Sequence, residues 1–350
     1  MTREATALDL AARLGHERVI VIHDPTSGLR SVIAIHSSAL GPAVGGTRMR
    51  AYPLFDAAVE DALLLSRAMT YKAAYAGMDF GGAKAVIDAD PTRPDRRALL
   101  AAHARAVHEL EGRFVTGGDM GVSIDDVRFM SQFSSAFEHA PAGAGPDASD
   151  LTAIGVAAAV RAAAERLGRP VAGLRVAIQG AGEVGGRLAT LLAEAGAQIT
   201  VADVVSERAE AVARASGASV APPEAILSAE CDVLSPNAAG GIFDARSIAT
   251  LRCAAICGAA NNQLAAPEAG DELDRRGILF APDFVASAGG ILSLLFEQGK
   301  LDVAGTVARV ERIGDDLGEL FDAAARLRIA PFRLAERRVD EKLAAARAAG

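Results

Sequence analysis

The stretch LRVAIQGAGEVGGRLATLLAEAGAQITVAD, residues 174–203, decides the fold of the second half of this 350-residue chain. It begins with an apolar run, turns at Gly180, Gly182 and Gly185, continues through a helix-forming segment and ends in a second apolar run closed by Asp203. Asp203 follows Gly180 by 23 residues. This order of strand, glycine turn, helix, strand and acid is typical of a dinucleotide-binding unit. The alternative is a glycine turn in another doubly wound protein, and the complete order argues against it.

Each position has a physical reason. Gly180 permits the tight turn, Gly182 lets the backbone approach a pyrophosphate, and Gly185 lets the helix pack closely on the sheet. The free N–H groups at the helix start favour an anion. Asp203 accepts hydrogen bonds from a ribose hydroxyl and repels a 2′-phosphate, which predicts NAD rather than NADP. The predicted cofactor-binding residues of this segment are Gly180, Ala181, Gly182, Glu183, Val184, Gly185 and Asp203.

Further short apolar runs extend this pattern. They alternate with helix-forming segments, as in a parallel sheet covered on both faces, so we expect an α/β fold with a Rossmann-type doubly wound sheet. The runs are residues 175–178, 198–202, 231–234, 254–257 and 278–280.

The first half differs in organisation. Residues 18–23 and 31–36 are rich in Val and Ile and read as strands, and 114–116 as a third. Helices are predicted over 56–76, 95–111 and, after the Gly/Pro-rich stretch 140–146, over 150–167. We therefore predict two domains: residues 1–145, joined by C-terminal helices of about 328–350, and residues 146–327.

Composition excludes several classes. The chain has 44 acidic and 36 basic residues, a net charge of −8, which disfavours a nucleic-acid partner. No apolar stretch is long enough to predict a membrane span, and the N-terminus lacks the apolar core of a signal peptide. Cys231, Cys253 and Cys257 form no Cys-x-x-Cys pair, so we expect buried thiols in the cytoplasm and no metal site.

The segment 41–86 carries two lysines. Lys72 is predicted near the end of an amphipathic helix, and Lys84 in a glycine loop 12 residues later. Two lysines this close are usually solvated surface. Small and apolar neighbours surround both, however, and this predicts partial burial and a functional role.

Several motifs now combine in one order. Besides the two lysine segments and the glycine turn, they are DPTSGLR (24–30), TGGDMG (116–121), TAIG (152–155), AANNQ (259–263) and APDFVASAGG (281–290). With these motifs the chain resembles the glutamate/leucine/phenylalanine/valine dehydrogenase family over nearly its whole length, and most its leucine and phenylalanine branch.

The resemblance implies a fold and an activity. It implies two domains around a cleft, commonly in a homo-oligomer, and NAD-dependent oxidative deamination of an apolar L-amino acid to its 2-oxo acid and ammonia. It implies that Lys72 binds the substrate carboxylate, that Lys84 is the general acid/base, and that Asp119 exchanges protons with the substrate nitrogen. It also places the backbone of Gly45 and Gly46 beside the substrate, and Thr152 and Asn261 near the nicotinamide and ribose.

The resemblance also assigns a side-chain pocket. Its members are apolar or small, and glutamate would leave a charge unpaired there, so a glutamate-type dehydrogenase is the less favoured alternative. Ser287 replaces an asparagine that contacts the substrate in typical members, which leaves a catalytically weakened regulatory homologue as a second alternative. The pocket residues are Val44, Met69, Gly117, Ile291 and Leu294.

Overall fold

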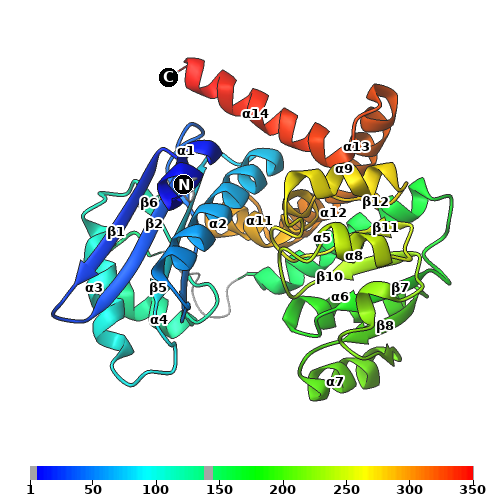
Figure 1. Ribbon diagram of the computed structural model, residues 1–350, viewed down its shortest axis with the longest axis horizontal. Helices are drawn as coiled ribbons and strands as arrows, with labels where there is room; N and C mark the ends of the chain where they lie inside the picture. The colour runs from blue at the N-terminus through cyan, green and yellow to red at the C-terminus, as the bar shows by residue number, and fades with distance from the viewer. Residues whose placement is uncertain (1–5, 138–144, 350) are drawn as a thin grey trace, which may run out of the picture. The chain divides into compact units, whose positions relative to one another are not determined.

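The computed structural model describes residues 6–137 and 145–349 and divides the chain into two compact units (Figure 1). Unit 1 comprises Met1–Gly143 and Val339–Gly350, and unit 2 comprises Ala144–Arg338. Most of the predicted boundary stretch 140–146 lies outside the described residues. Among the residues that the structure describes, no helix is both long and apolar enough to cross a bilayer.

Unit 1 is built on a mixed six-stranded sheet. Strand β2 pairs antiparallel with both β1 and β5, whereas β3 and β4 both run parallel to β5, and β3 also pairs with β6. The strands are β1 (Arg18–Asp24), β2 (Leu29–Ser37), β3 (Ala43–Val44), β4 (Thr47–Arg50), β5 (Gly81–Asp88) and β6 (Phe114–Val115).

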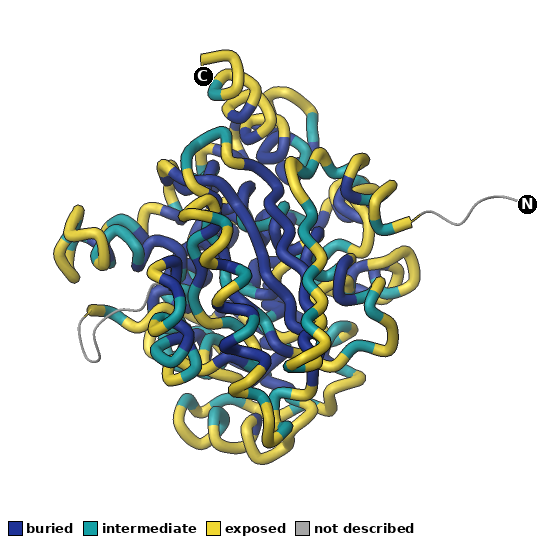
Figure 2. The backbone as a smooth tube through the Cα atoms, turned by 90° about the vertical axis from the view of Figure 1, so that its left-hand side faces the viewer, coloured by how far each residue is buried: buried dark blue, intermediate teal, exposed yellow. Residues whose placement is uncertain are grey.

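Helices cover both faces of this sheet. Alternate residues of β2 point to opposite faces, so Val32 and Ala34 pack beneath helices α1 and α2, while Ile33 and Ile35 pack beneath α3 and α4. In Figure 2 the central strands of this unit are largely buried and the outer turns exposed. The helices are α1 (Ala7–Leu14), α2 (Phe55–Ala76), α3 (Arg96–His108) and α4 (Ile124–Met130).

Unit 2 holds a parallel sheet in the order β12-β11-β10-β7-β8-β9. The chain starts in the middle at β7, builds to one edge and returns to build the other, which confirms the predicted doubly wound α/β fold. The strands are β7 (Arg175–Gln179), β8 (Gln198–Ala202), β9 (Ser219–Val220), β10 (Val233–Pro236), β11 (Ala255–Ile256) and β12 (Leu279–Phe280).

Strand β10 is shifted from its predicted range. We expect residues 231–234, but β10 begins two residues later, because Asp232 accepts the backbone N–H of Arg175 through its carboxylate at 2.9 Å and binds the Arg175 side chain as well. A carboxylate thus satisfies the donor at the start of β7.

The helices of unit 2 include the long Ala-rich α5, which packs against α6, α11 and α13. Its small side chains allow close approach: a Cβ at Gly314 of α13 would lie 3.1 Å from the carbonyl oxygen of Ala158. The main helices are α5 (Ala148–Arg166), α6 (Glu183–Glu194), α7 (Ser206–Ser216), α8 (Ala245–Thr250), α9 (Pro267–Arg275), α10 (Asp283–Ala286), α11 (Gly289–Glu297), α12 (Val303–Glu311) and α13 (Ile313–Leu327).

Helix α14 (Pro331–Ala349) crosses the division between the units. Its residues from Val339 onward belong to unit 1, where the Tyr71 hydroxyl donates to Asp340 and the Lys342 ammonium donates to the carbonyl of Ala74 at 2.9 Å. These bonds fasten the end of the chain to helix α2.

Candidate active site

Lys84 lies within strand β5, which corrects the predicted glycine loop. It is opposite Ala34 of β2 in the register, and with Val86 it faces helix α2, since Ala83 and Ala85 pack on the other face. Its side chain is buried. The neighbouring glycines favour close packing here instead of a turn.

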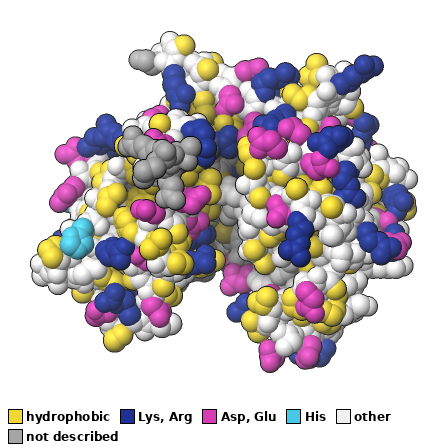
Figure 3. All heavy atoms as spheres, viewed as in Figure 1, with side chains coloured by type: hydrophobic (Ala, Val, Ile, Leu, Met, Phe, Trp, Pro, Cys, Tyr) yellow, Lys and Arg dark blue, Asp and Glu magenta, His cyan; other side chains and the backbone are white. Residues whose placement is uncertain are grey.

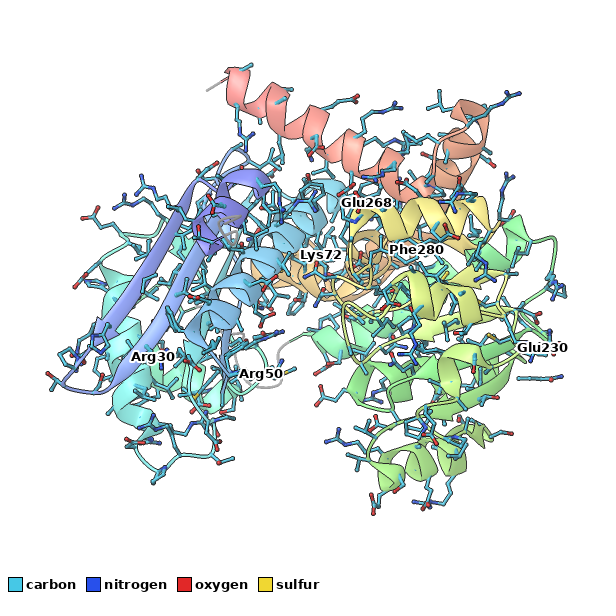
Figure 4. All side chains as sticks on the ribbon, in the orientation of Figure 1. Arg30, Arg50, Lys72, Glu230, Glu268 and Phe280 are labelled. Atoms are coloured by element: carbon cyan, nitrogen blue, oxygen red, sulfur yellow. The ribbon has the colours of Figure 1, made fainter. Side chains whose placement is uncertain are left out.

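That packing is visible at Gly82. A Cβ there would lie 2.1 Å from the backbone nitrogen of Thr70, so helix α2 rests directly on the strand. Lys72 follows Thr70 by two residues on α2 and is 9% exposed, and Figure 4 shows it on that helix. The predicted burial of both lysines is confirmed.

Gly45 and Gly46 interrupt the strand formed by β3 and β4. A Cβ at Gly45 would lie 1.7 Å from the carbonyl oxygen of Ala83, and one at Gly46 would lie 3.0 Å from the Cβ of Asp119. Only glycine permits this approach. The backbone of the pair therefore lies between the strand of Lys84 and the loop of Asp119, where the sequence analysis expects substrate.

The loop after β6 is bonded along this segment. The N–H of Gly45 donates to Val115 at 3.1 Å, and that of Thr47 donates to Gly117 at 2.9 Å. This pairing continues the β3–β6 ladder and carries Asp119 to the side of Lys84. Their side chains form an ion pair with Nζ 3.0 Å from Oδ2.

Arg48 is a further residue of the site, and the sequence does not predict it. Its Nε donates to Oδ2 of Asp119 at 2.8 Å, and its Nη1 donates to Oδ2 of Asp61 at 2.9 Å. Tyr52 also donates to Asp61. The only local signal is the motif Gly-Gly-Thr-Arg, which does not reveal the partners.

The charges set the protonation of Asp119. Burial opposes ionisation, but the ammonium of Lys84 and the guanidinium of Arg48 outweigh it and hold the pKa of Asp119 well below its usual range. Asp119 is therefore a carboxylate at neutral pH. A buried carboxylate paired with an ammonium is able to accept and release protons.

The predicted pocket residues lie in two groups. Val44, Met69 and Gly117 are half-buried in unit 1. In unit 2, Ile291 is buried and Leu294 is half-buried in helix α11. The structure describes each group within its own unit, and their common pocket stays a prediction.

Ser287, also in unit 2, is buried at the end of helix α10. Its hydroxyl donates to the carbonyl of Asp283 at 2.6 Å. The hydroxyl proton is therefore used within the protein, and only the oxygen lone pairs remain to accept a hydrogen bond from a ligand.

The glycine turn after β7 fits a dinucleotide. Gly180 has the left-handed φ of +95°, and a Cβ at Gly185 would lie 1.9 Å from the carbonyl oxygen of Gly180, so both are needed for the turn and for the packing of α6. A Cβ at Gly182 would meet no atom within 4 Å, so the space above it is open. The turn also lies where the strand order reverses between β7 and β10, the usual ligand position in such sheets.

Asp203, at the end of β8, stabilises this turn through two hydrogen bonds. Its two carboxylate oxygens accept the N–H groups of Ala181 at 2.7 Å and Val205 at 2.9 Å. A carboxylate has about four lone-pair positions, so it retains capacity for a ribose hydroxyl. Glu183 is exposed at the start of α6 and accepts a hydrogen bond from Ser149, while Val184 is half-buried.

A second loop contacts the glycine turn, and the sequence does not predict this contact. A Cβ at Gly180 would lie 2.9 Å from the Cβ of Ala238, and the Asn237 side chain accepts the N–H of Ala259 at 3.0 Å. The loop after β10 therefore adjoins the glycine turn at the same end of the sheet. The sequence carries only a short run of small residues as a signal.

The remaining two predicted cofactor residues lie in unit 2. Thr152 is half-buried on α5, where its hydroxyl donates to Ala148 at 2.7 Å, and Gly290 closely approaches it. Asn261 is exposed after β11, and its carbonyl oxygen would be 2.4 Å from a Cβ at Gly240. Their contacts with a cofactor stay a prediction.

Comparison with known proteins agrees with this arrangement. A family model described as "Glu/Leu/Phe/Val dehydrogenase, dimerisation domain" matches residues 16–135, and one described as "Glutamate/Leucine/Phenylalanine/Valine dehydrogenase" matches 143–207 and 201–301. Valine dehydrogenase of Streptomyces virginiae is 41% identical over 344 residues, covering 95% of each chain. Leucine dehydrogenase of Bacillus cereus is 37% identical, covering 94% of this chain and 91% of its own.

A solved structure agrees as well. L-tryptophan dehydrogenase from Nostoc punctiforme superposes with a TM-score of 0.79 at 37% identity, over 97% of this chain and 99% of its own. The chain therefore belongs to the glutamate/leucine/phenylalanine/valine dehydrogenase family and is an amino-acid dehydrogenase, an oxidoreductase that acts on the CH–NH2 group of its donor with NAD or NADP.

Proposed function

We propose that this protein carries out the reversible, NAD-dependent oxidative deamination of an apolar L-amino acid to its 2-oxo acid and ammonia. The observation that carries the proposal is the Lys84–Asp119 ion pair at 3.0 Å beside the Gly45–Gly46 backbone, in a sheet covered by helix α2, which carries the buried Lys72. Its catalytic and substrate-binding unit is unit 1, and unit 2 binds the cofactor.

Each charged residue has a role in this proposal. Lys72 binds the substrate carboxylate, because a buried ammonium is a strong partner for an anion. Asp119 takes a proton from the substrate ammonium group and leaves a neutral amine. Lys84, after releasing its own proton to solvent, takes a proton from the water that adds to the imine carbon, while Asp119 keeps the substrate proton until ammonia leaves.

The N–H groups at the start of α6, together with Asp203, Thr152 and Asn261, would hold NAD at the glycine turn. Bound NAD would supply the acceptor for the hydride of the α-carbon. Asp203 supports NAD over NADP, because a phosphate beside this carboxylate is repelled and Val204, which follows it, is 89% exposed and uncharged. We expect a higher kcat/KM with NAD, and Asp203→Ser should narrow the difference. Equal or higher efficiency of the wild type with NADP would contradict the assignment.

The substrate side chain is apolar in this proposal. Val44, Met69, Ile291 and Leu294 supply apolar surface, and each buried methylene contributes about 0.8 kcal/mol, so leucine should exceed alanine clearly. Gly117 leaves room for a larger side chain, so phenylalanine is a further candidate. The valine, leucine and tryptophan dehydrogenases to which the chain is similar support an apolar substrate.

A panel of L-amino acids assayed with NAD tests the proposal through the absorbance of the reduced cofactor. We expect turnover with leucine, valine, isoleucine or phenylalanine and little with alanine. A preference for glutamate would contradict the apolar pocket. Complete absence of turnover would instead favour a regulatory homologue that has lost catalysis.

We further propose a cytoplasmic homo-oligomer with no nucleic-acid partner. The family model for residues 16–135 is described as a dimerisation domain, which supports oligomer formation. The face shown in Figure 3 carries acidic and basic side chains interspersed, as expected for a protein without a basic binding surface. Cys231, Cys253 and Cys257 are free thiols, consistent with a reducing compartment.

A further inference from the structure

Arg48 is a largely buried cation that the proposed reaction does not use. Its side chain is 12% exposed, and its guanidinium binds two carboxylates from different elements, Asp119 after β6 through Nε and Asp61 of α2 through Nη1. Burying an arginine is costly unless its donors are paired. The two carboxylates provide this pairing, and the guanidinium in turn holds both of them in place.

As a result, the two carboxylate oxygens of Asp119 differ in their hydrogen-bond partners. Oδ2 accepts from Arg48 at 2.8 Å and from Lys84 at 3.0 Å. For Oδ1 the described residues show no hydrogen-bond partner, and the Asp119 side chain is 25% exposed. One oxygen is therefore committed to the protein's own cations, and the other is left to face a ligand.

We propose that Arg48 is a positioning residue for the deamination, which orients Asp119 so that Oδ1 exchanges the proton of the substrate nitrogen. This inference rests on the proposed function. In the forward direction an N–H bond of the substrate ammonium breaks, its proton forms an O–H bond at Oδ1, and the electron pair stays on nitrogen. Asp119 becomes neutral and returns the proton when ammonia leaves.

The charges around Asp119 make the role of Arg48 measurable. Lys84 faces it from β5, Arg48 faces it from β4, and Asp61 of α2 lies behind Arg48. Arg48 offsets the negative charge of Asp61, so without it two carboxylates would share the single ammonium of Lys84.

Tyr52 and Asp88 form the outer layer of this cluster. Tyr52 donates to Asp61, and burial together with that bond raises the pKa of Tyr52 well above its usual value, so the hydroxyl keeps its proton. Asp88, at the end of β5, accepts the backbone N–H of Tyr52 at 3.1 Å and pairs with Arg30 at 3.4 Å, so its charge is already offset.

Two variants that each remove one charge test the proposal with opposite signs. The acid limb of the kcat/KM profile reports release of the proton held by the Lys84–Asp119 pair. Arg48→Gln removes a positive charge, so the pair should keep its proton to higher pH and the limb should move up by about one unit. Asp61→Asn removes a negative charge and should move the limb down.

Arg48→Lys separates charge from position. Lysine keeps the positive charge but lacks the fork that reaches both carboxylates, so the acid limb should stay near that of the wild type while kcat falls about tenfold. Arg93→Gln is the matched control, because Arg93 forms its ion pair with Asp95 outside this cluster, and its profile should be unchanged.

Three results would overturn the inference. One is an Arg48→Gln enzyme with the wild-type limb and kcat. Another is that the Arg48→Gln and Asp61→Asn enzymes are only less stable or slower, and that their acid limbs do not move in opposite directions. Arg48 would then be a purely structural residue. If the wild type turns over no L-amino acid, the proposed function fails and this inference with it. If the wild type is active but the acid limbs of the two variants do not shift, this inference fails and the proposed function stands.

Discussion

At the scale of single residues, Lys84 and Lys72 are both buried but have different surroundings. Lys84 is in an ion pair with Asp119 beside a glycine backbone, whereas Lys72 lies on the helix that packs on Gly82. Burial alone therefore does not distinguish their roles. The distinction has to come from kinetics, because a group acting in the transition state lowers kcat and one that binds uniformly raises KM.

We expect Lys84→Ala to lower kcat by about 10²- to 10⁴-fold while NAD binding stays near that of the wild type. Lys72→Ala should act mainly on the KM of the amino acid. Steady-state kinetics with a separate titration of NAD would measure both effects, and the exposed Lys300→Ala serves as the control. Near-normal kcat in the Lys84 variant would exclude it as the acid/base.

Ser287 leads to a second prediction at this scale. Its hydroxyl proton is donated to Asp283, so serine offers a ligand only an acceptor, whereas asparagine offers a carbonyl and an amide and reaches further. We expect Ser287→Asn to raise kcat/KM, by about 1–3 kcal/mol of transition-state stabilisation if a substrate polar group is unpaired in the wild type. A loss on the best substrate would identify Ser287 as a specificity residue instead.

At the scale of elements, the turn before α6 contains glycines with separate purposes. A Cβ at Gly182 meets open space, and one at Gly185 collides with the carbonyl of Gly180. Gly182→Ala should therefore leave Tm within a few degrees of the wild type and weaken NAD binding. Gly185→Ala should lower both, because α6 must move. Thermal unfolding and NAD titration measure both effects in the two variants. Unchanged NAD affinity in the Gly182 variant would show that the pyrophosphate does not bind at this position.

Strand β1 is the second element with a consequence of its own. It is an edge strand of its sheet, with Val21 61% exposed, and it belongs to the part of the chain matched by the dimerisation-domain model. An apolar edge of this kind favours pairing with another chain, and an edge lysine opposes it. We expect Val21→Lys to lower the oligomer mass measured by light scattering.

The matched control for that experiment is Val220→Lys. Val220 is 50% exposed on β9, which is also an edge strand but lies in unit 2. If both variants keep the wild-type mass, β1 does not form the interface. If only the Val220 variant dissociates, the interface involves the other sheet.

At the scale of the whole molecule, buried histidines connect stability to pH. Burial, with the neighbouring His16 adding to it, lowers the pKa of His36 to about 3, and burial lowers that of His103 to about 4. Both are neutral in the folded state, whereas the unfolded chain binds their protons below about pH 6.5. Their contribution to the free energy of unfolding is therefore complete above pH 6.5 and is lost as the pH falls toward 4 and 3.

We accordingly expect Tm to fall between pH 6.5 and 4, with unit 1 unfolding first because both histidines lie there. His36→Gln should lower Tm at pH 7. It should also make the unfolding free energy less dependent on pH, because about one proton fewer is bound on unfolding. His108→Gln, at an exposed position of α3, is the control and should keep the wild-type slope. An unchanged slope in the His36 variant would show that other groups cause the acid loss.

The sequence by itself determines the elements and the sheet type of unit 2. Apolar runs, the glycine turn and the closing acid are local properties, and in unit 1 helix α2 likewise begins and ends within a residue of its predicted range, 56–76. The short range of these signals also explains the errors. Glycines next to Lys84 look the same whether they form a turn or admit a neighbouring backbone, and only packing against Thr70, from a separate helix, decides for the strand.

The short range of sequence signals also divides the site residues into those that the sequence predicts and those that it does not. Lys72, Lys84 and Asp119 are predictable from motifs, because each has a distinctive local context. Arg48 is not, since its partners Asp61 and Asp119 are 13 and 71 residues away and are brought to it by helix α2 and by the loop bonded along β4. The sequence specifies residue types and their local order, whereas charges from distant segments are paired only once the sheet has formed.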